Sequence, residues 1–193
     1  MLIGVFLLLC FASVPVAGGR LGALADVRLR ARPLLMTGLA LQILIVTVAP
    51  GGCPALHAAA HVASYALAAG FVFANRAIPF LWTIALGGLL NFVAIVTNGG
   101  VMPAAPAALA TAGIASDPGR FSNSAALAAP HLRALGDVFA VPASWPVSNV
   151  FSIGDVLIVA GAFLALHALC GSRLFPRRRA LAARARPLPA STP

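Results

Sequence analysis

The stretch that decides the fold is LLMTGLALQILIVTVA, residues 34–49, which PGGCP, residues 50–54, joins to ALHAAAHVASYALAAGFVFA, residues 55–74. Neither apolar run contains a charged residue. Each run is close to the roughly 17 to 25 residues that a helix needs to cross the hydrocarbon of a bilayer. Proline and glycine between the runs favour a tight turn. The stretch therefore predicts two antiparallel helices that have hydrocarbon as their solvent.

The composition of the whole chain points the same way. Its 193 residues are 61% hydrophobic and only 9% charged, with a mean hydropathy of +0.98, whereas about 25% of the residues in a typical soluble domain are charged. Helices are favoured over strands because a helix satisfies its backbone hydrogen bonds within its own segment. We therefore predict an all-α integral membrane bundle with a long outer loop and five transmembrane helices, at residues 2–17, 34–49, 55–74, 79–97 and 153–170.

The arginines between these segments predict the orientation. Eleven of the thirteen lie on one predicted side of the membrane, whereas only Arg120 and Arg133 lie in the long gap at residues 99–152. Because basic residues are retained on the cytoplasmic side, we expect the N-terminus outside and the C-terminus inside. A cleaved secretory signal at residues 1–19 is the alternative for the first segment, and the absence of a basic residue before its apolar run disfavours it.

Two regions lie outside the predicted helices. The loop at residues 99–152 contains apolar stretches at 106–112 and 125–135 that are compatible with interfacial helices. A loop of this length is usually a lid or disordered, and its apolar content favours a lid on the membrane surface. Residues 173–193 are rich in Arg, Ala and Pro and predict a basic, disordered cytoplasmic tail, so that the membrane domain comprises residues 1–172.

Polar residues near the outer ends of three predicted helices are the candidates for a site, because polar groups in apolar spans cost free energy. Asn91 and Asn98 are seven residues apart and share a face of the fourth helix. His57 and His61 are one turn apart in the third helix, and Asp155 begins the fifth. We expect these side chains to converge in a polar cavity beneath the loop.

Each candidate also has a purely structural interpretation. Asp155 follows Ser152 by three positions, which is the spacing of a capping box at a helix N-terminus. Asn98, followed by two glycines, is typical of a helix end. His57 and His61 have the spacing of paired metal ligands, but no Cys, Glu or third nearby His completes a zinc site. We therefore expect no metal and no cofactor, with His57 and His61 as weak metal candidates.

Several short motifs carry a family resemblance: LGGLLN at residues 86–91, NGGVMP at 98–103, LGD at 135–137 and VFSIGD at 150–155, together with His131. The sequence resembles an uncharacterised family of bacterial multi-span membrane proteins that is catalogued as a domain of unknown function. The resemblance implies a bacterial inner-membrane location and a shared motif at the outer face, and it implies no activity. The residues that we expect to bind a ligand or partner are Asn91, Asn98, Gly99, Gly100, Met102, Pro103, His131, Asp137, Gly154 and Asp155.

The chain is also similar, more weakly, to bacterial lipoprotein signal peptidases. These helical membrane aspartic proteases have one aspartate at the outer end of each of their last two spans. VFSIGD resembles one of their two motifs, and GLLN, residues 88–91, resembles the start of the other, but Phe92 follows Asn91 and no aspartate comes next. Because aspartic proteolysis needs two carboxylates that share a proton, Asp137 would have to fold back over Asp155.

The sequence as a whole favours an uncharacterised, non-catalytic multi-pass membrane protein with an outer-leaflet polar site for a lipid, a small ligand or a membrane partner. We expect membrane lipids as partners, together with a homo-oligomer or another membrane protein. The net charge of +9 is assigned to topology and lipid headgroups rather than to nucleic acid. An intramembrane hydrolase that uses Asp155 with Asp137 is the alternative function.

Overall fold

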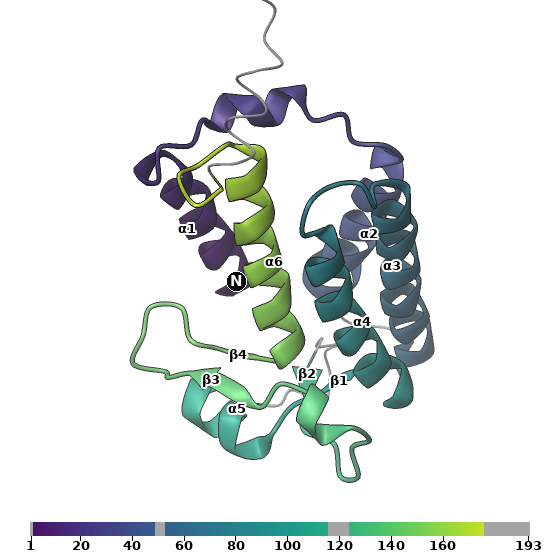
Figure 1. The fold of residues 1–193 in the computed structure, drawn as a ribbon. Coiled ribbons are helices and arrows are strands. Elements are labelled where there is room, and N and C mark those ends of the chain that lie inside the picture. The colour runs from purple at the N-terminus through teal and green to yellow at the C-terminus, as the bar shows by residue number, and fades with distance from the viewer. Residues whose placement is uncertain (1, 49–52, 116–123, 176–193) are drawn as a thin grey trace, which may run out of the picture.

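The computed structural model describes residues 2–48, 53–115 and 124–175 and is mostly helical. All five predicted apolar segments form helices. In Figure 1, α6 lies between α1 and α4, and α2 and α3 pair on the other side of α4. The helices of the bundle are α1 (Leu2–Val16), the 3-10 helix η1 (Leu21–Asp26), α2 (Arg32–Ile43) with its π-helical continuation η2 (Leu44–Val48), α3 (Pro54–Ala74), α4 (Leu81–Thr97) and α6 (Ile153–Leu169).

The lengths of these helices decide how many could cross a membrane unaided. Among the described residues, Ala55–Ala74 in α3 is long and apolar enough to do so. Gly4–Val16, Arg32–Val48, Leu81–Thr97 and Ile153–Leu169 are apolar but shorter. The described residues thus contain five apolar helices, but only one of them is long enough to be identified as a transmembrane helix by its length.

Glycine brings α4 and α6 close together. A Cβ added at Gly87 would overlap the carbonyl oxygen of Gly154, and one added at Gly161 would lie 2.7 Å from Cγ1 of Ile84. Helix backbones approach closely where small residues face the neighbouring helix. The two helices that carry the predicted site residues Asn91 and Asp155 are therefore in direct backbone contact.

Buried polar side chains join the other helices. The two ring nitrogens of His167 in α6 lie 3.0 Å from the hydroxyls of Ser13 in α1 and of Ser172. Gln42 of α2 donates a hydrogen bond of 2.7 Å to the hydroxyl of Ser64 in α3. Polar contacts of this kind hold apolar helices in a defined arrangement where apolar packing alone is not selective.

Residues 99–115 and 124–152 form a folded unit, here called the cap, over the end of the bundle where α4 ends and α6 begins (Figure 1). The all-α prediction is wrong here, because the cap contains short strands. Its apolar stretch at 106–112 is helical as predicted, whereas the one at 125–135 begins at the end of a short strand and contains a short 3-10 turn but no α-helix. The elements of the cap are β1 (Met102–Pro103), α5 (Pro106–Ala112), β2 (Ser124–Ala125), η3 (Arg133–Leu135), β3 (Phe139–Val141) and β4 (Asn149–Phe151).

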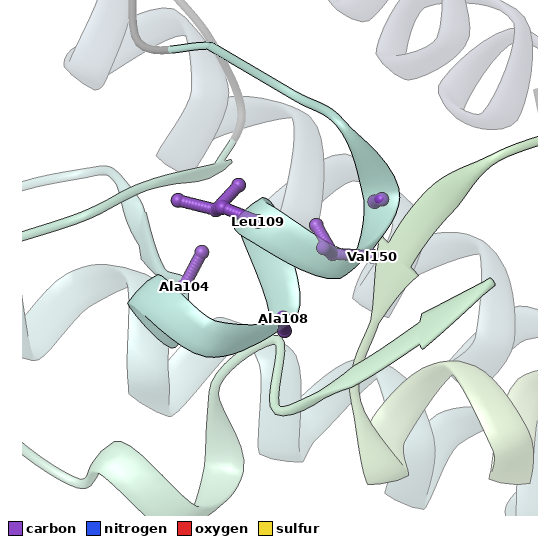
Figure 2. Packing of buried hydrophobic residues seen from close by; sticks show 5 residues of the cluster. Ala104, Ala108, Leu109 and Val150 are labelled. Carbon is purple, nitrogen blue, oxygen red and sulfur yellow. The ribbon is translucent and has the colours of Figure 1, made fainter. Parts of the chain in front are cut away.

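The cap has its own small core. Strand β1 pairs in parallel with β2, and β3 pairs antiparallel with β4. Helix α5 packs on β3 and β4. The buried apolar cluster at this contact is shown in Figure 2 and consists of Ala104, Ala108, Leu109, Ala112 and Val150. Most of the predicted turn at residues 50–54, Arg120, and residues 176–193 of the predicted tail lie outside the described residues. The first residues of that tail are ordered against the bundle, because the Arg173 amide donates to the Ala17 carbonyl at 2.9 Å.

Candidate functional site

A polar cavity of about 420 Å³ lies between the cap and the bundle. Its wall combines side chains of α3, α4 and α6 with side chains of the cap, and the C-terminal part of α2 completes it. Two of the four acidic residues in the chain line this one cavity. The lining residues are Gln42, Val46, His61, Tyr65, Asn91, Ile95, Met102, Leu109, Ile114, Ser124, Asp137, Asn149, Val150 and Asp155.

Asn91, Ser152 and Asp155 form a closed hydrogen-bonded network at the start of α6. The Ser152 hydroxyl accepts from the Asp155 amide, and Asp155 Oδ2 accepts from the Ser152 amide, both at 3.0 Å, which makes a capping box. Asn91 donates from Nδ2 to Asp155 Oδ1, and its Oδ1 accepts from the Ser152 hydroxyl, both at 2.8 Å. The capping interpretation of Asp155 is therefore confirmed, and the same residue also lines the cavity.

Gly154 makes room for this network. A Cβ added at Gly154 would overlap Oδ1 of Asn91, so any larger residue would push the Asn91 amide away from Ser152 and Asp155. Packing therefore explains why residue 154 in the motif VFSIGD is glycine: the Asn91 side chain lies against its backbone, where a Cβ would not fit. It positions the site without contributing a polar group to it.

Asp137 enters the cavity from the cap. Its amide donates to the Pro103 carbonyl at 2.9 Å, and its carbonyl accepts from the Ala105 amide at 3.0 Å. The Ser124 hydroxyl donates to its carboxylate. Burial, together with the charge of Asp155, raises the pKa of Asp137 to about 6, against the opposing effect of the Ser124 hydrogen bond. The charge of Asp155 therefore acts on the Asp137 carboxyl group across the cavity.

Helix α3 contributes an imidazole and the single tyrosine of the chain. Nδ1 of His61 lies 2.8 Å from the Gly100 carbonyl oxygen. Because a carbonyl oxygen only accepts hydrogen bonds, Nδ1 carries the proton. The His61 ring packs against Tyr65 with 5.7 Å between the ring centroids, and the Tyr65 hydroxyl interacts with the Asn91 side chain. Tyr65 therefore connects α3 to the network on α4 and α6.

Asn98 ends α4 and does not line the cavity. Its Nδ2 donates to the His131 carbonyl at 2.9 Å, and its Oδ1 accepts from the His131 amide at 2.8 Å, so His131 takes part through its backbone. Gly99 and Gly100 have φ values of +70° and +93°, which favour glycine. The shared helical face does not bring Asn98 and Asn91 into one cavity, because the Asn98 side chain turns towards the cap where the helix ends.

The remaining predicted residues divide between the cavity wall and its support. Met102 lines the cavity, and Pro103 supports Asp137 through its carbonyl oxygen. Nδ1 of His57 lies 3.0 Å from the Cys53 carbonyl oxygen, and His57 is not among the lining residues. In the part of the chain that the structure describes, no group of three or more His, Cys, Asp or Glu side chains is arranged to hold a metal ion.

Four polar lining residues are not predicted from the sequence: Gln42, Tyr65, Ser124 and Asn149. Gln42 carries a usable signal, because it is the one amide side chain in the apolar run at residues 34–49. Ser124 and Asn149 lie in short strands of the cap, where neither spacing nor hydropathy distinguishes them from other loop residues.

Residues 26–167 match the model of a family of unknown function, DUF5317. The chain belongs to this family. The matched segment includes every residue that lines the polar cavity and leaves out α1. Membership of a family of unknown function is thus confirmed, while the family motifs and the bacterial origin stay predictions. No curated protein and no solved structure matches the chain.

Proposed function

We propose that the chain is a multi-pass membrane protein that binds a small ligand in the polar cavity beneath its cap. One observation carries the proposal: two carboxylates, an imidazole and three amide side chains line a single cavity of about 420 Å³. Polar groups that converge in a cavity of this size are typical of a binding site. Hydrogen bonds within the protein already position Asn91, Asp155 and Asp137, so little ordering remains for a ligand to impose.

The membrane location is supported by the apolar surface of the helices. Leu8, Leu56, Phe73 and Trp82 are each at least 60% exposed. Only 22% of the apolar window in α3 is buried, whereas a helix that is apolar all round and belongs to a soluble core is mostly buried. Exposed apolar surface of this extent favours hydrocarbon over water as the surrounding medium.

Five spans are part of this proposal. The 17 residues of α4 or α6 make a helix about 25 Å long, against a hydrocarbon core of about 30 Å. Local thinning of the bilayer and flanking residues at the interface accommodate such a difference. The arginine pattern supports an orientation with the N-terminus and the cap outside and the C-terminus inside. The proposal also includes a bacterial inner membrane as the location, a membrane domain at residues 1–172 and a basic tail at 173–193.

Cysteine labelling tests the orientation. Cys53 is exposed while Cys10 and Cys170 are buried, so Cys53→Ala gives a background with little reactivity. In that background, Trp145→Cys in the cap should react with a membrane-impermeant maleimide in intact cells. Arg28→Cys, between α1 and α2, should react only after the membrane is permeabilised. The reverse pattern would overturn the orientation, and labelling of both sites in intact cells would overturn the membrane placement.

Native mass spectrometry in mild detergent tests ligand binding. Asp137→Asn removes one carboxylate from the cavity while keeping an oxygen that can accept from Ser124. Asp26→Asn is the matched control, because Asp26 is exposed at the end of η1. We expect a bound lipid or small molecule on the wild type and on Asp26→Asn that is reduced on Asp137→Asn. The same occupancy on all three proteins would contradict the proposal. So would a folded wild type that stays empty after incubation with a membrane lipid extract.

A hydrolase is the second candidate, and the cavity shared by Asp137 and Asp155 favours it. The similarity to lipoprotein signal peptidases requires a second carboxylate near Asp155, and among the described residues Asp137 is the other acid that lines the same cavity. The charge of Asp155 contributes to the raised pKa of Asp137, as in carboxylate pairs that share a proton. Binding is the primary proposal because both Asp155 oxygens already accept hydrogen bonds, from Asn91 and Ser152.

Incubation with lipid-modified precursor peptides decides between the two candidates. Turnover that is lost in both Asp137→Asn and Asp155→Asn, and kept in Asp26→Asn, would establish the hydrolase. No turnover at any pH between about 4 and 8, where a coupled pair of carboxyl groups passes through its singly protonated form, would exclude it.

A further inference from the structure

A second cavity of about 480 Å³, here called the apolar groove, extends along α3 and α4. Apart from Tyr65 and the indole of Trp82, its described lining residues are apolar, and they include Ala69 and Phe73 of α3 and Gly88 and Phe92 of α4. Nothing lies within 4 Å of a Cβ added at Gly88, so the groove is open at that point. The groove is therefore shaped and lined for hydrocarbon rather than for a polar molecule.

The apolar groove adjoins the polar cavity. Tyr65 lines both. On α4, Asn91 lines the polar cavity and the next residue, Phe92, lines the groove. On α6, Asp155 lines the cavity, and Ile158, about one turn further on, lines the groove. The same three helices therefore line both cavities, with Tyr65 and Phe92 in ring contact at 5.8 Å between centroids where the two adjoin.

The dimensions of the groove suit a hydrocarbon chain. Its lining on α4 extends from Trp82 to Phe92, which corresponds to about 15 Å along the helix axis. Phe73, Trp82 and Leu89 on its rim are each more than half exposed. In the proposed membrane location, lipid chains would reach this rim directly.

The charges of the polar cavity complement a cation. Asp137 and Asp155 both line it, and none of the lining residues in the described ranges 2–48, 53–115 and 124–175 is an arginine. A carboxylate that is removed from water without a positive partner is disfavoured, and a cation beside it restores the balance. An ammonium group can also donate hydrogen bonds to carboxylate oxygens, which strengthens the contact.

We propose that the polar cavity and the apolar groove together bind one amphiphile, with a positively charged amine head and a single hydrocarbon chain. The head lies against Asp137 and Asp155, and the chain passes Tyr65 and follows α3 and α4. This inference rests on the proposed ligand-binding function and names the ligand class for that site.

The test uses the full chain in a nonionic detergent with two probes that report on the two ends of the site. Butylammonium fits the polar cavity without filling the groove, and its binding is measured as protection against thermal unfolding. Dodecylammonium with a diazirine at its terminal carbon reports the chain position by photo-crosslinking and peptide mapping. Dodecanol with the same diazirine is the neutral control for the head.

Matched variants separate the two ends. Gly88→Leu fills the groove, and Gly4→Leu puts the same side chain at a helical glycine of α1 that also has open space around it. Asp137→Asn alters the cavity, and the exposed Asp26 supplies the control Asp26→Asn. We expect dodecylammonium to crosslink within residues 65–73 and 82–92, and this labelling to fall about tenfold in Gly88→Leu and Asp137→Asn but not in the controls.

Two results would overturn the inference. Crosslinks spread evenly over all the apolar helices would show that the groove does not hold the chain, and equal labelling by dodecanol would show that the head charge is not recognised. If butylammonium still protects the wild type but not Asp137→Asn, the proposed ligand-binding function survives either result. If neither amine interacts with the wild type, the inference fails, and native mass spectrometry of the wild type, Asp137→Asn and Asp26→Asn decides the proposed ligand-binding function separately.

Discussion

Replacing Asp137 by asparagine should remove a pH dependence from the stability of the folded chain. The Asp137 side chain is only 4% exposed. Burial, with the charge of Asp155, raises its pKa from 3.8 to about 6, although the Ser124 hydroxyl donates a hydrogen bond that opposes the shift. The carboxyl group therefore holds its proton more tightly in the folded chain than in the unfolded chain.

The sign of the effect follows from the order in which the two states lose this proton. Well below about pH 4 Asp137 is protonated in both states and adds no pH dependence to the free energy of unfolding. Between about pH 4 and pH 6 the unfolded chain ionises first, so the free energy of unfolding falls as the pH rises. Above about pH 7 the loss is complete. A pKa difference of about 2 pH units at 1.36 kcal/mol each gives roughly 3 kcal/mol.

The assay is thermal or urea unfolding of the wild type and the variants in one detergent, at intervals from pH 4 to pH 8. The wild type and the control Asp26→Asn should lose stability together as the pH rises. Asp137→Asn should not follow them, so that it becomes the more stable protein, by roughly 3 kcal/mol above pH 7. A bound amine should flatten the wild-type profile, because a cation beside Asp137 favours its ionised form.

Parallel profiles of the wild type and Asp137→Asn between pH 4 and pH 8 would refute this reasoning. They would mean that the Asp137 carboxyl is as well hydrated in the folded chain as in the unfolded one. Bulk water would then fill the cavity and screen its two carboxylates, so that they would discriminate little between a cationic and a neutral ligand.

Three further predictions concern the supports of the site. Gly154→Ala should cost about 2 to 4 kcal/mol of stability, because the added Cβ overlaps the side-chain amide of Asn91 on α4. Gly88→Ala should be neutral or gain about 1 kcal/mol, and the opposite ranking in thermal unfolding would contradict the packing argument. Ser152→Ala should cost about 1 to 2 kcal/mol through loss of the capping box, and an unchanged melting temperature would argue against that role. Asn98→Ala should cost about 1 to 3 kcal/mol and expose the cap to limited proteolysis. Asn75→Ala, at the end of α3, should leave the cap resistant, and equal cleavage of both variants would count against the Asn98 contact.

The helices of the bundle could be predicted because their sequence signal is local. An apolar run bounded by proline or glycine is enough to place α3 at Pro54–Ala74, one residue from the predicted start at Ala55. The end of α2 could not be placed, because the chain passes from α-helix to π-helix at Leu44 within an unbroken apolar run. Hydropathy does not distinguish one helical hydrogen-bonding pattern from another.

The cap could not be predicted in the same way, because its structure depends on contacts between distant residues. Its strands are two or three residues long, too short for an alternating pattern to appear. The pairing of Met102 with Ser124 joins residues 22 positions apart and brings the Ser124 hydroxyl to Asp137. The sequence therefore marks Asp137 as a candidate but gives no account of the surroundings that raise its pKa.

Asn98 and Asp155 show why polar residues near helix ends are ambiguous in an apolar chain. Asn98 hydrogen bonds in both directions with the backbone of His131, as Asn75 does with the backbone of Arg30, so both asparagines fasten a helix end to a remote segment. Asp155 caps α6 and also lines the cavity, so a change there alters folding and binding together. Asp137 lies in no helix and caps none, so its replacement alters the cavity without removing the capping box of α6.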